Sequence, residues 1–312
     1  MKQLSTAKIT ILLFLVSTVL HSRAHFFSDF YDNYIKHWVS ETKQETYQVE
    51  DANTLVVEIP RGTIKITGWD GKNIEVTTCK HAPAKEHLTS IVLKKTKESK
   101  TLKLHAQFSQ PTTKGIMDVE LLVPKNLHIS LATQQGNIHA KNLGGMVTAT
   151  TQQGAIQAKD IRGNLIAHAE QGNIIVKKAQ NHVKATTHTG NITIYDAQKN
   201  IIASTHTGSI DTRFKQLDTR ANVQLSSTSG NITLGLPEGS NADVYAKTEK
   251  GQLTCEHFIT TKPQTMQLNT KNWQRQKREV NGLIGSGEAN IKMTSVNSSI
   301  KIINLSEQEI TA

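Results

Sequence analysis

The sequence predicts an all-β protein whose body is a single-stranded parallel β-solenoid (β-helix) with coils of about 18 residues. Glycine recurs every 18 residues in the same local setting, at Gly136, Gly154, Gly172, Gly190 and Gly208. Self-similarity at a short fixed period indicates one structural unit stacked on copies of itself. Abundant Thr, Ile, Val, Asn and Gly, with only 5% aromatic residues, favour many short strands joined by turns.

Each unit is predicted to hold two short strands that bend at the glycine. Isoleucine stands two residues after each of these glycines, and small, β-branched or leucine residues stand three, five and seven residues before it. Because alternate positions on a strand share a face, these columns should line a thin interior between two sheets, with no room for a buried ligand. The same template fits segments outside the strict period. Its reference glycines are Gly62, Gly136, Gly154, Gly172, Gly190, Gly208, Gly230 and Gly251.

The glycine column is expected to turn the chain with a positive φ, a conformation that strains other residues. Asparagine follows the glycine in four units, where it is expected to form a stacked amide ladder at the same corner: Asn137, Asn173, Asn191 and Asn231. In the last segment Ser298 takes the place of the glycine, which predicts a looser bend.

Residues 1–24 are predicted to be a secretory signal peptide. Lys2 and Lys8 accompany an apolar run over residues 9–20, and residues 22–24 (SRA) have the small-x-small pattern of a cleavage site. The run is shorter than the roughly 20 apolar residues that span a bilayer, although retention as an anchor is the alternative. The protein is therefore expected to be exported, to the periplasm or to the cell surface, with no transmembrane helix in the mature chain.

The rest of the chain divides into three parts. Residues 25–50 are aromatic-rich and are predicted to include a short amphipathic helix that caps the first coil, since uncovered strand edges invite aggregation. An adhesive or membrane-touching segment is the alternative. Residues 51–303 are the solenoid domain, and residues 304–312 are a tail. Within the domain we expect irregular strands over 51–125 with a short helix over 82–90, regular coils over 126–256, a loop over 257–290 and a closing coil over 291–303.

The net charge is moderately basic. It is +10 for the whole sequence and falls to +7 when Lys2, Lys8 and Arg23 leave with the signal peptide. A basic protein favours anionic partners, but the excess is spread along the chain and serves solubility equally well. The basic residues of the 257–290 loop form a candidate anion-binding contact, with a merely solvated loop as the alternative. They are Lys271, Arg275, Lys277 and Arg278.

Two outward columns carry residue types that could support chemistry. Asp160, Lys178 and Asp196 stand six residues after successive glycines, where alternating charges would offset like-charge repulsion. Glu170, His188 and His206 stand two residues before successive glycines, and two histidines with a carboxylate are a metal-ligand set by type. Parallel side chains on a flat ladder converge poorly, so we expect an exposed polar ladder there. No catalytic, cofactor or metal site is predicted.

The two cysteines are predicted not to form an intrachain disulfide. Cys79 lies just after the first coil and Cys255 several coils later, a separation far beyond the roughly 7 Å between Cα atoms that a disulfide allows. Cys255 falls in an inward column and is expected to be buried as a small hydrophobic residue.

Three segments carry a resemblance to a known family: residues 57–70 (VEIPRGTIKITGWD), 119–124 (VELLVP) and 285–302. They resemble the putative adhesin family of bacterial secreted β-solenoid proteins, a domain of unknown function, over about residues 45–303. The resemblance implies a non-enzymatic role in adhesion, binding or envelope scaffolding, since the family offers no catalytic residues to carry over. The partners it suggests are glycans, anionic envelope components or another protein, and not a specific nucleic acid. The rival is a polysaccharide lyase or hydrolase on a β-helix, which needs carboxylates converging on a groove. The oligomeric state stays open.

Overall fold

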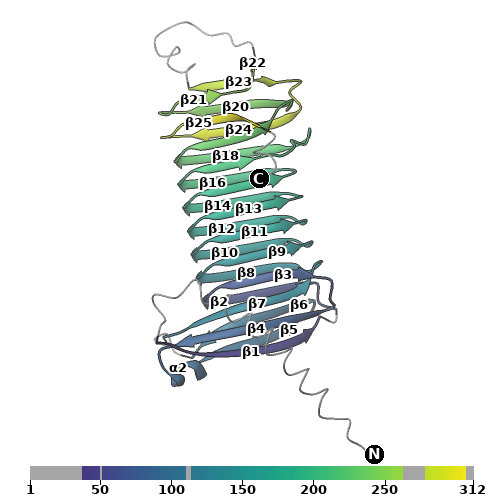
Figure 1. Cartoon of the computed structure of the whole chain (residues 1–312), viewed down its shortest axis with the longest axis vertical. Coiled ribbons are helices and arrows are strands. Elements are labelled where there is room, and N and C mark those ends of the chain that lie inside the picture. Colours follow the sequence, from purple (N-terminus) through teal and green to yellow (C-terminus); the bar gives the residue numbers. More distant parts are fainter. Residues whose placement is uncertain (1–36, 50, 110–113, 263–277, 307–312) are drawn as a thin grey trace, which may run out of the picture.

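The computed structural model describes residues 37–49, 51–109, 114–262 and 278–306. They form a tall stack of strands, with the N-terminal strands at one end and the strands after residue 240 at the other (Figure 1). Two sheets run the length of the stack and enclose a continuous apolar core. The predicted β-solenoid is confirmed.

The first sheet, called sheet A, has 12 strands. In hydrogen-bonded order they are β1 (Val39–Gln48), β4 (Asn73–Ala82), β7 (Ile116–Pro124), β3 (Ile64–Trp69), β9 (Ile138–Leu143), β11 (Ile156–Ile161), β13 (Ile174–Ala179), β15 (Ile192–Ala197), β17 (Ile210–Arg213), β19 (Ile232–Pro237), β25 (Ile300–Leu305) and β21 (Leu253–Cys255).

The second sheet, called sheet B, has 13 strands. In hydrogen-bonded order they are β22 (Thr260–Thr261), β23 (Glu279–Ile284), β20 (Ala242–Thr248), β24 (Ala289–Ser295), β18 (Asn222–Ser229), β16 (Ile201–Thr207), β14 (Val183–Thr189), β12 (Leu165–Gln171), β10 (Val147–Gln153), β8 (His128–Gln135), β2 (Thr54–Arg61), β6 (Thr101–Phe108) and β5 (Ile91–Glu98). The one helix that the structure describes is α2 (Lys85–Thr89), inside the predicted 82–90 segment and far too short to cross a bilayer.

The 18-residue period places equivalent residues directly opposite one another in parallel ladders. Ala149 pairs with Ala167, Ala167 with Ala185, and Ala185 with Ala203, and all four are at most 1% exposed. The isoleucine column facing them is equally buried: Ile138, Ile156, Ile174, Ile192 and Ile210. Alanine opposite isoleucine keeps the two sheets close together, so the interior is filled by side chains.

The glycine corner depends on both backbone conformation and space. Seven of the eight reference glycines have φ between +134° and +155°, which confirms the predicted positive φ. Gly251 does not adopt it. A Cβ added to Gly172 would lie 1.9 Å from the carbonyl oxygen of Gly154 in the coil below, and one added to Gly251 would lie 2.2 Å from that of Ser298. Close stacking of the coils therefore favours glycine at the corner even at Gly251, where the backbone conformation does not require it.

Side chains satisfy the backbone groups that the ladders leave unpaired at this corner. The buried hydroxyl of Thr187 donates to the carbonyl of Gly172 at 3.0 Å. At the position directly after the glycine, the N–H of Ser209 donates to Oδ1 of Asn191 in the preceding coil at 2.8 Å. The asparagines therefore bond to the backbone of the next coil, and the predicted ladder of amide on amide is wrong. The hydroxyls that play the part of Thr187 in other coils belong to Thr133, Thr151, Thr205, Ser227 and Thr248.

A second corner explains the column six residues after each glycine. Asn142, Asp160, Lys178 and Asp196 have φ between +54° and +58°, a left-handed conformation that Asn and Asp tolerate best among non-glycine residues. Among the described residues no ion pair joins Asp160 or Asp196 to Lys178. The alternating charges therefore form no direct ion pairs with one another, and backbone conformation explains why Asn and Asp recur in the column.

The N-terminal end departs from the predicted helical cap. Val39–Gln48 form strand β1, which pairs antiparallel with β4, while residues 25–36 lie outside the described part of the chain. Most side chains of β1 are exposed, and only Glu45–Gln48 alternate half-buried and exposed, so its sequence shows little of the period that marks a strand. Strands β1 and β4 thus close the end of sheet A, and β5, paired antiparallel with β6, closes the end of sheet B.

The C-terminal end has a different coil order from the one predicted. The coil of β24 and β25 lies between the coil of β18 and β19 and that of β20 and β21, so the predicted closing coil is internal. Part of the predicted loop, Glu279–Ile284, is strand β23 and pairs antiparallel with β20. Cys255 is only half-buried because β21 pairs with β25 alone. Cys79 is buried, and both cysteines are free, as predicted.

Replacement of Gly172 by alanine should destabilise the rod by at least about 3 kcal/mol. Strain at φ +155° adds to overlap with the backbone of the preceding coil, which cannot move aside without separating the ladders. The matched control is Gly239→Ala, where φ is +76° and a Cβ would meet nothing within 4 Å, so strain alone acts. Urea unfolding of both variants separates the two effects. Equal losses of stability would show that the close approach of the coils is unimportant.

Removing a hydroxyl from the buried column should lower stability, and adding one should raise it. Thr187→Val should destabilise by about 1–3 kcal/mol, since it leaves the carbonyl of Gly172 without its donor. Ala169 holds the same position one coil earlier, so Ala169→Thr should supply a donor to Gly154 and stabilise by about 1 kcal/mol. Thr186→Val, on the outer face of the same strand, is the control and should change the unfolding free energy little. A destabilising Ala169→Thr would contradict the hydrogen-bond account.

Candidate binding surface

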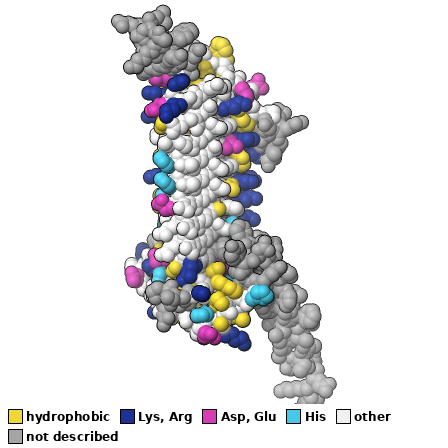
Figure 2. Space-filling model, turned by 90° about the vertical axis from the view of Figure 1, so that its left-hand side faces the viewer, with side chains coloured by type: hydrophobic (Ala, Val, Ile, Leu, Met, Phe, Trp, Pro, Cys, Tyr) yellow, Lys and Arg dark blue, Asp and Glu magenta, His cyan; other side chains and the backbone are white. Residues whose placement is uncertain are grey.

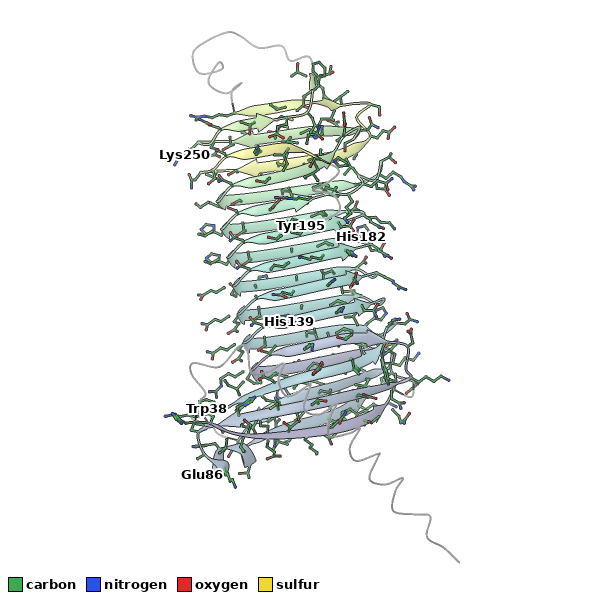
Figure 3. All side chains as sticks on the ribbon, in the orientation of Figure 1. Trp38, Glu86, His139, His182, Tyr195 and Lys250 are labelled. Atoms are coloured by element: carbon green, nitrogen blue, oxygen red, sulfur yellow. The ribbon has the colours of Figure 1, made fainter. Side chains whose placement is uncertain are left out.

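The edge of the rod at the glycine corner is uncharged along the middle of the stack. Its exposed side chains in the middle of the stack come from the residue before each glycine, such as Gln153, Gln171 and Thr189. Figure 2 looks onto this edge, which stays almost free of charged side chains along the middle of the rod, and Lys250 marks the same edge in Figure 3. The charged side chains lie on the two sheet faces that flank it (Figure 2).

The outer face of sheet B carries the predicted column of histidines and a carboxylate. The rings of His188 and His206 stack with centroids 4.9 Å apart and planes 7° apart. The carboxylate of Glu170 instead lies 3.0 Å from Nε2 of His168, on its own strand. The structure therefore divides the column into a stacked histidine pair and a separate His–Glu pair. Within the described ranges no group of three or more His, Cys, Asp or Glu is placed to hold a metal ion.

The outer face of sheet A carries a column of lysines. Lys141 pairs with Lys159 in the ladder and Lys159 with Lys177, and all three are exposed. We call these three residues the lysine ladder. The column continues with Tyr195 and then Arg213. Sequence reasoning missed it, although the signal is present: the position five residues after each glycine reads Lys, Lys, Lys, Tyr and Arg.

The column beside the lysine ladder is uncharged. It holds His139, Gln157 and Ile175, two residues before each lysine on the same face. Burial lowers the pKa of His139, and the positive charge of Lys65 lowers it further against a hydrogen bond with Gln157. His139 is therefore neutral at neutral pH. Figure 3 labels His139 and Tyr195 on this face, one above the other along the axis.

Comparison with family models decides the family. The model described as Toastrack DUF4097 matches residues 47–303, most of the chain. The chain belongs to the Toastrack DUF4097 family. The predicted resemblance to an adhesin-like β-solenoid domain of unknown function is thereby confirmed.

Several solved structures are similar to this chain at low sequence identity. A putative adhesin from Parabacteroides distasonis ATCC 8503 is 10% identical, with 84% of this chain and 97% of that chain covered and a TM-score of 0.47. A putative lipid binding protein from the same organism is 13% identical, with 85% and 96% covered and a TM-score of 0.45. A putative adhesin from Parabacteroides merdae ATCC 43184 is 10% identical, with 84% and 96% covered and a TM-score of 0.43. The search of curated proteins finds no match.

The predicted anion-binding loop of this Toastrack chain lies mostly outside the described residues, as Lys271, Arg275 and Lys277 all do. Arg278 is described, and its guanidinium donates to the carbonyl of Glu249. The backbone carbonyl of Arg278 accepts from the N–H of Thr248. Arg278 thus holds the end of β20 against the start of β23.

The N-terminal strands of the Toastrack domain enclose a buried ionisable pair that sequence reasoning also missed. Asp118 is fully buried, and its Oδ1 accepts from the N–H of Thr63 at 2.6 Å. Its Oδ2 lies 3.4 Å from Nε2 of His81, whose Nδ1 lies 2.9 Å from the hydroxyl of Ser40. Burial alone lowers the pKa of His81, but hydrogen bonds and charge interactions with Asp118 and Cys79 outweigh it and raise the pKa to about 9. A protonated His81 thus ties β1 and β4 to β7.

This pair predicts how stability depends on pH. Because the pKa of His81 rises on folding, its contribution is fully present below about pH 6.5 and is lost as the pH rises through about 9. The free energy of unfolding should therefore fall across that window, and Asp118→Asn should flatten the fall. Glu120→Gln is the control, since it removes a carboxylate of the same strand that pairs with Lys65 and not with His81. Denaturant unfolding at pH 6 to 9 measures both, and an unchanged slope in Asp118→Asn would contradict the assignment.

Proposed function

We propose that this protein is an exported, non-enzymatic binding protein of the cell envelope with an adhesin-like role. The observation that carries the proposal is the pair of long flat outer faces on which like side chains repeat in register from coil to coil. Such faces offer many equivalent contacts to an extended partner. The filled interior supports this reading, since the core columns leave the outer surface as the place for binding.

The predicted enzyme rival, a glycan lyase or hydrolase, needs carboxylates that converge on a groove. Asp160 and Asp196 lie at left-handed corners two coils apart, and Lys178 holds the same position in the coil between them. One observation favours a different hydrolase. The hydroxyl of Ser40 contacts His81, and His81 in turn lies beside Asp118. This is the order of nucleophile, base and acid in a catalytic triad. His81, with a pKa raised to about 9, is protonated at neutral pH and cannot accept a proton from Ser40 as a base, and Asp118 already accepts from Thr63.

Binding to envelope material tests the proposal. Purified protein without residues 1–24 should sediment with the insoluble envelope fraction of bacterial cells and leave the material chemically unchanged. Saturable binding is expected, because the equivalent surface sites are limited in number. Heat-unfolded protein is the control for nonspecific adsorption. A folded protein that stays in the supernatant at every concentration would contradict the proposal.

The hydrolase alternative has its own readout. A fluorophosphonate probe labels an activated serine and should leave Ser40 unlabelled in the intact protein. Labelling that disappears in both Ser40→Ala and His81→Gln would overturn the non-enzymatic assignment, whatever the outcome of the sedimentation assay.

A further inference from the structure

We propose that the lysine ladder of sheet A binds a linear acidic polysaccharide that lies along the axis of the rod. The inference rests on the proposed binding function and names its site and ligand class. It replaces the 257–290 loop as the main candidate for anion binding.

The positive charges of the ladder are not neutralised by nearby acids. Among the described residues no carboxylate lies within ion-pair distance of Lys141, Lys159 or Lys177. Asp160 follows Lys159 in the chain but forms no such pair. Elsewhere on the same sheet basic residues do have partners, as Lys65 with Glu120 at 2.9 Å and Arg213 with Asp211 at 3.2 Å. The contrast singles out the ladder.

The three lysines face one another across neighbouring strands and so destabilise the fold, since like charges directly opposite one another repel. Positions that break a local rule without a structural gain are expected at functional sites. An anionic ligand would supply the missing counter-charge. Release of its counterions would add to the affinity, as it does for other polyanions.

The shape of the charged column fits one extended chain. Parallel strands lie about 4.8 Å apart, so the three lysines span about 10 Å in single file, and Tyr195 and the Asp211-paired Arg213 extend the column to about 19 Å. The outward column on one side of it is uncharged, since His139 is neutral and Gln157 and Ile175 carry no charge, and the corner on its other side mixes Asp160 and Asp196 with Lys178. A membrane surface would match a broad basic patch better than this narrow row.

The aromatic content favours a polysaccharide over single-stranded nucleic acid. Nucleic-acid grooves stack successive bases on several aromatic rings. This column has one ring, that of Tyr195, and cations from the strands on either side already lie over it. Nζ of Lys177 lies 5.9 Å, and Cζ of Arg213 5.5 Å, from its centroid. Carboxylates of an acidic sugar chain need charge and hydrogen-bond donors along their path, which the ladder supplies.

The test compares two triple variants of the full-length mature protein against polygalacturonate, a linear carboxylated polysaccharide. The ladder variant is Lys141→Gln, Lys159→Gln and Lys177→Gln. The control is Lys184→Gln, Lys250→Gln and Lys292→Gln, which removes the same charge from exposed lysines on sheet B and the glycine edge. Titration calorimetry should show affinity reduced at least about tenfold in the ladder variant, with a shallower salt dependence, and reduced less than about threefold in the control.

Three further results keep the outcome decisive. The ladder variant should melt no lower than wild type, because repulsion is relieved, so lost affinity cannot reflect unfolding. Equal losses in both triple variants would overturn the site, as would tighter binding to an oligothymidylate or to phosphatidylglycerol vesicles than to polygalacturonate. If envelope sedimentation persists in wild type while polygalacturonate fails to bind, this inference fails and the proposed function stands. If sedimentation fails as well, both fail.

Discussion

Adjacent coils meet at the glycine corner so closely that no side chain fits between them. A Cβ at Gly154, Gly172 or Gly190 would lie within about 2 Å of the carbonyl of the coil below. This contact fixes the register, because a coil shifted by one residue would bring a side chain into that space and turn every inward residue outward. The 18-residue period, the two sheets and the in-register outer columns all follow from it.

Fixed register then acts differently inside and outside the rod. Inside, it stacks small residues on small residues, and the Thr187 column places a hydroxyl beside most of the glycine carbonyls, with Ala169 as an exception. Outside, it brings identical side chains face to face whatever their charge. Stacked histidine rings tolerate this, as His188 and His206 do. Stacked lysines do so only at a cost to stability, which is why the lysine ladder is the feature most in need of a functional reason.

Periodicity explains what the sequence predicts well and what it does not. The repeat, its inward columns and the turn at Gly172 follow from residues 18 apart, so each was predictable. The position of the last coil was not, since it depends on β24 pairing with β18 across more than sixty residues that the local pattern does not order. The aromatic cluster before Val39 suggested a helix for a segment whose described part is mostly strand β1. On the surface, the recurring lysines are present in the sequence, but only the strand register shows that they lie directly opposite one another.

The two ends show why a repetitive rod still needs irregular parts. A regular coil at either end of the rod would leave unpaired strand edges, on which further strands could stack. At the N-terminal end β1 pairs antiparallel with β4, and β5 pairs antiparallel with β6, which breaks the parallel register. Charged residues along β1 and β5 disfavour pairing with a further strand. At the other end β23 likewise pairs antiparallel with β20, and the outermost strand of sheet A, β21, has only three residues. Both ends therefore disfavour end-to-end growth in the same way. The lateral faces of the rod remain as the surfaces on which a long partner could make repeated contacts.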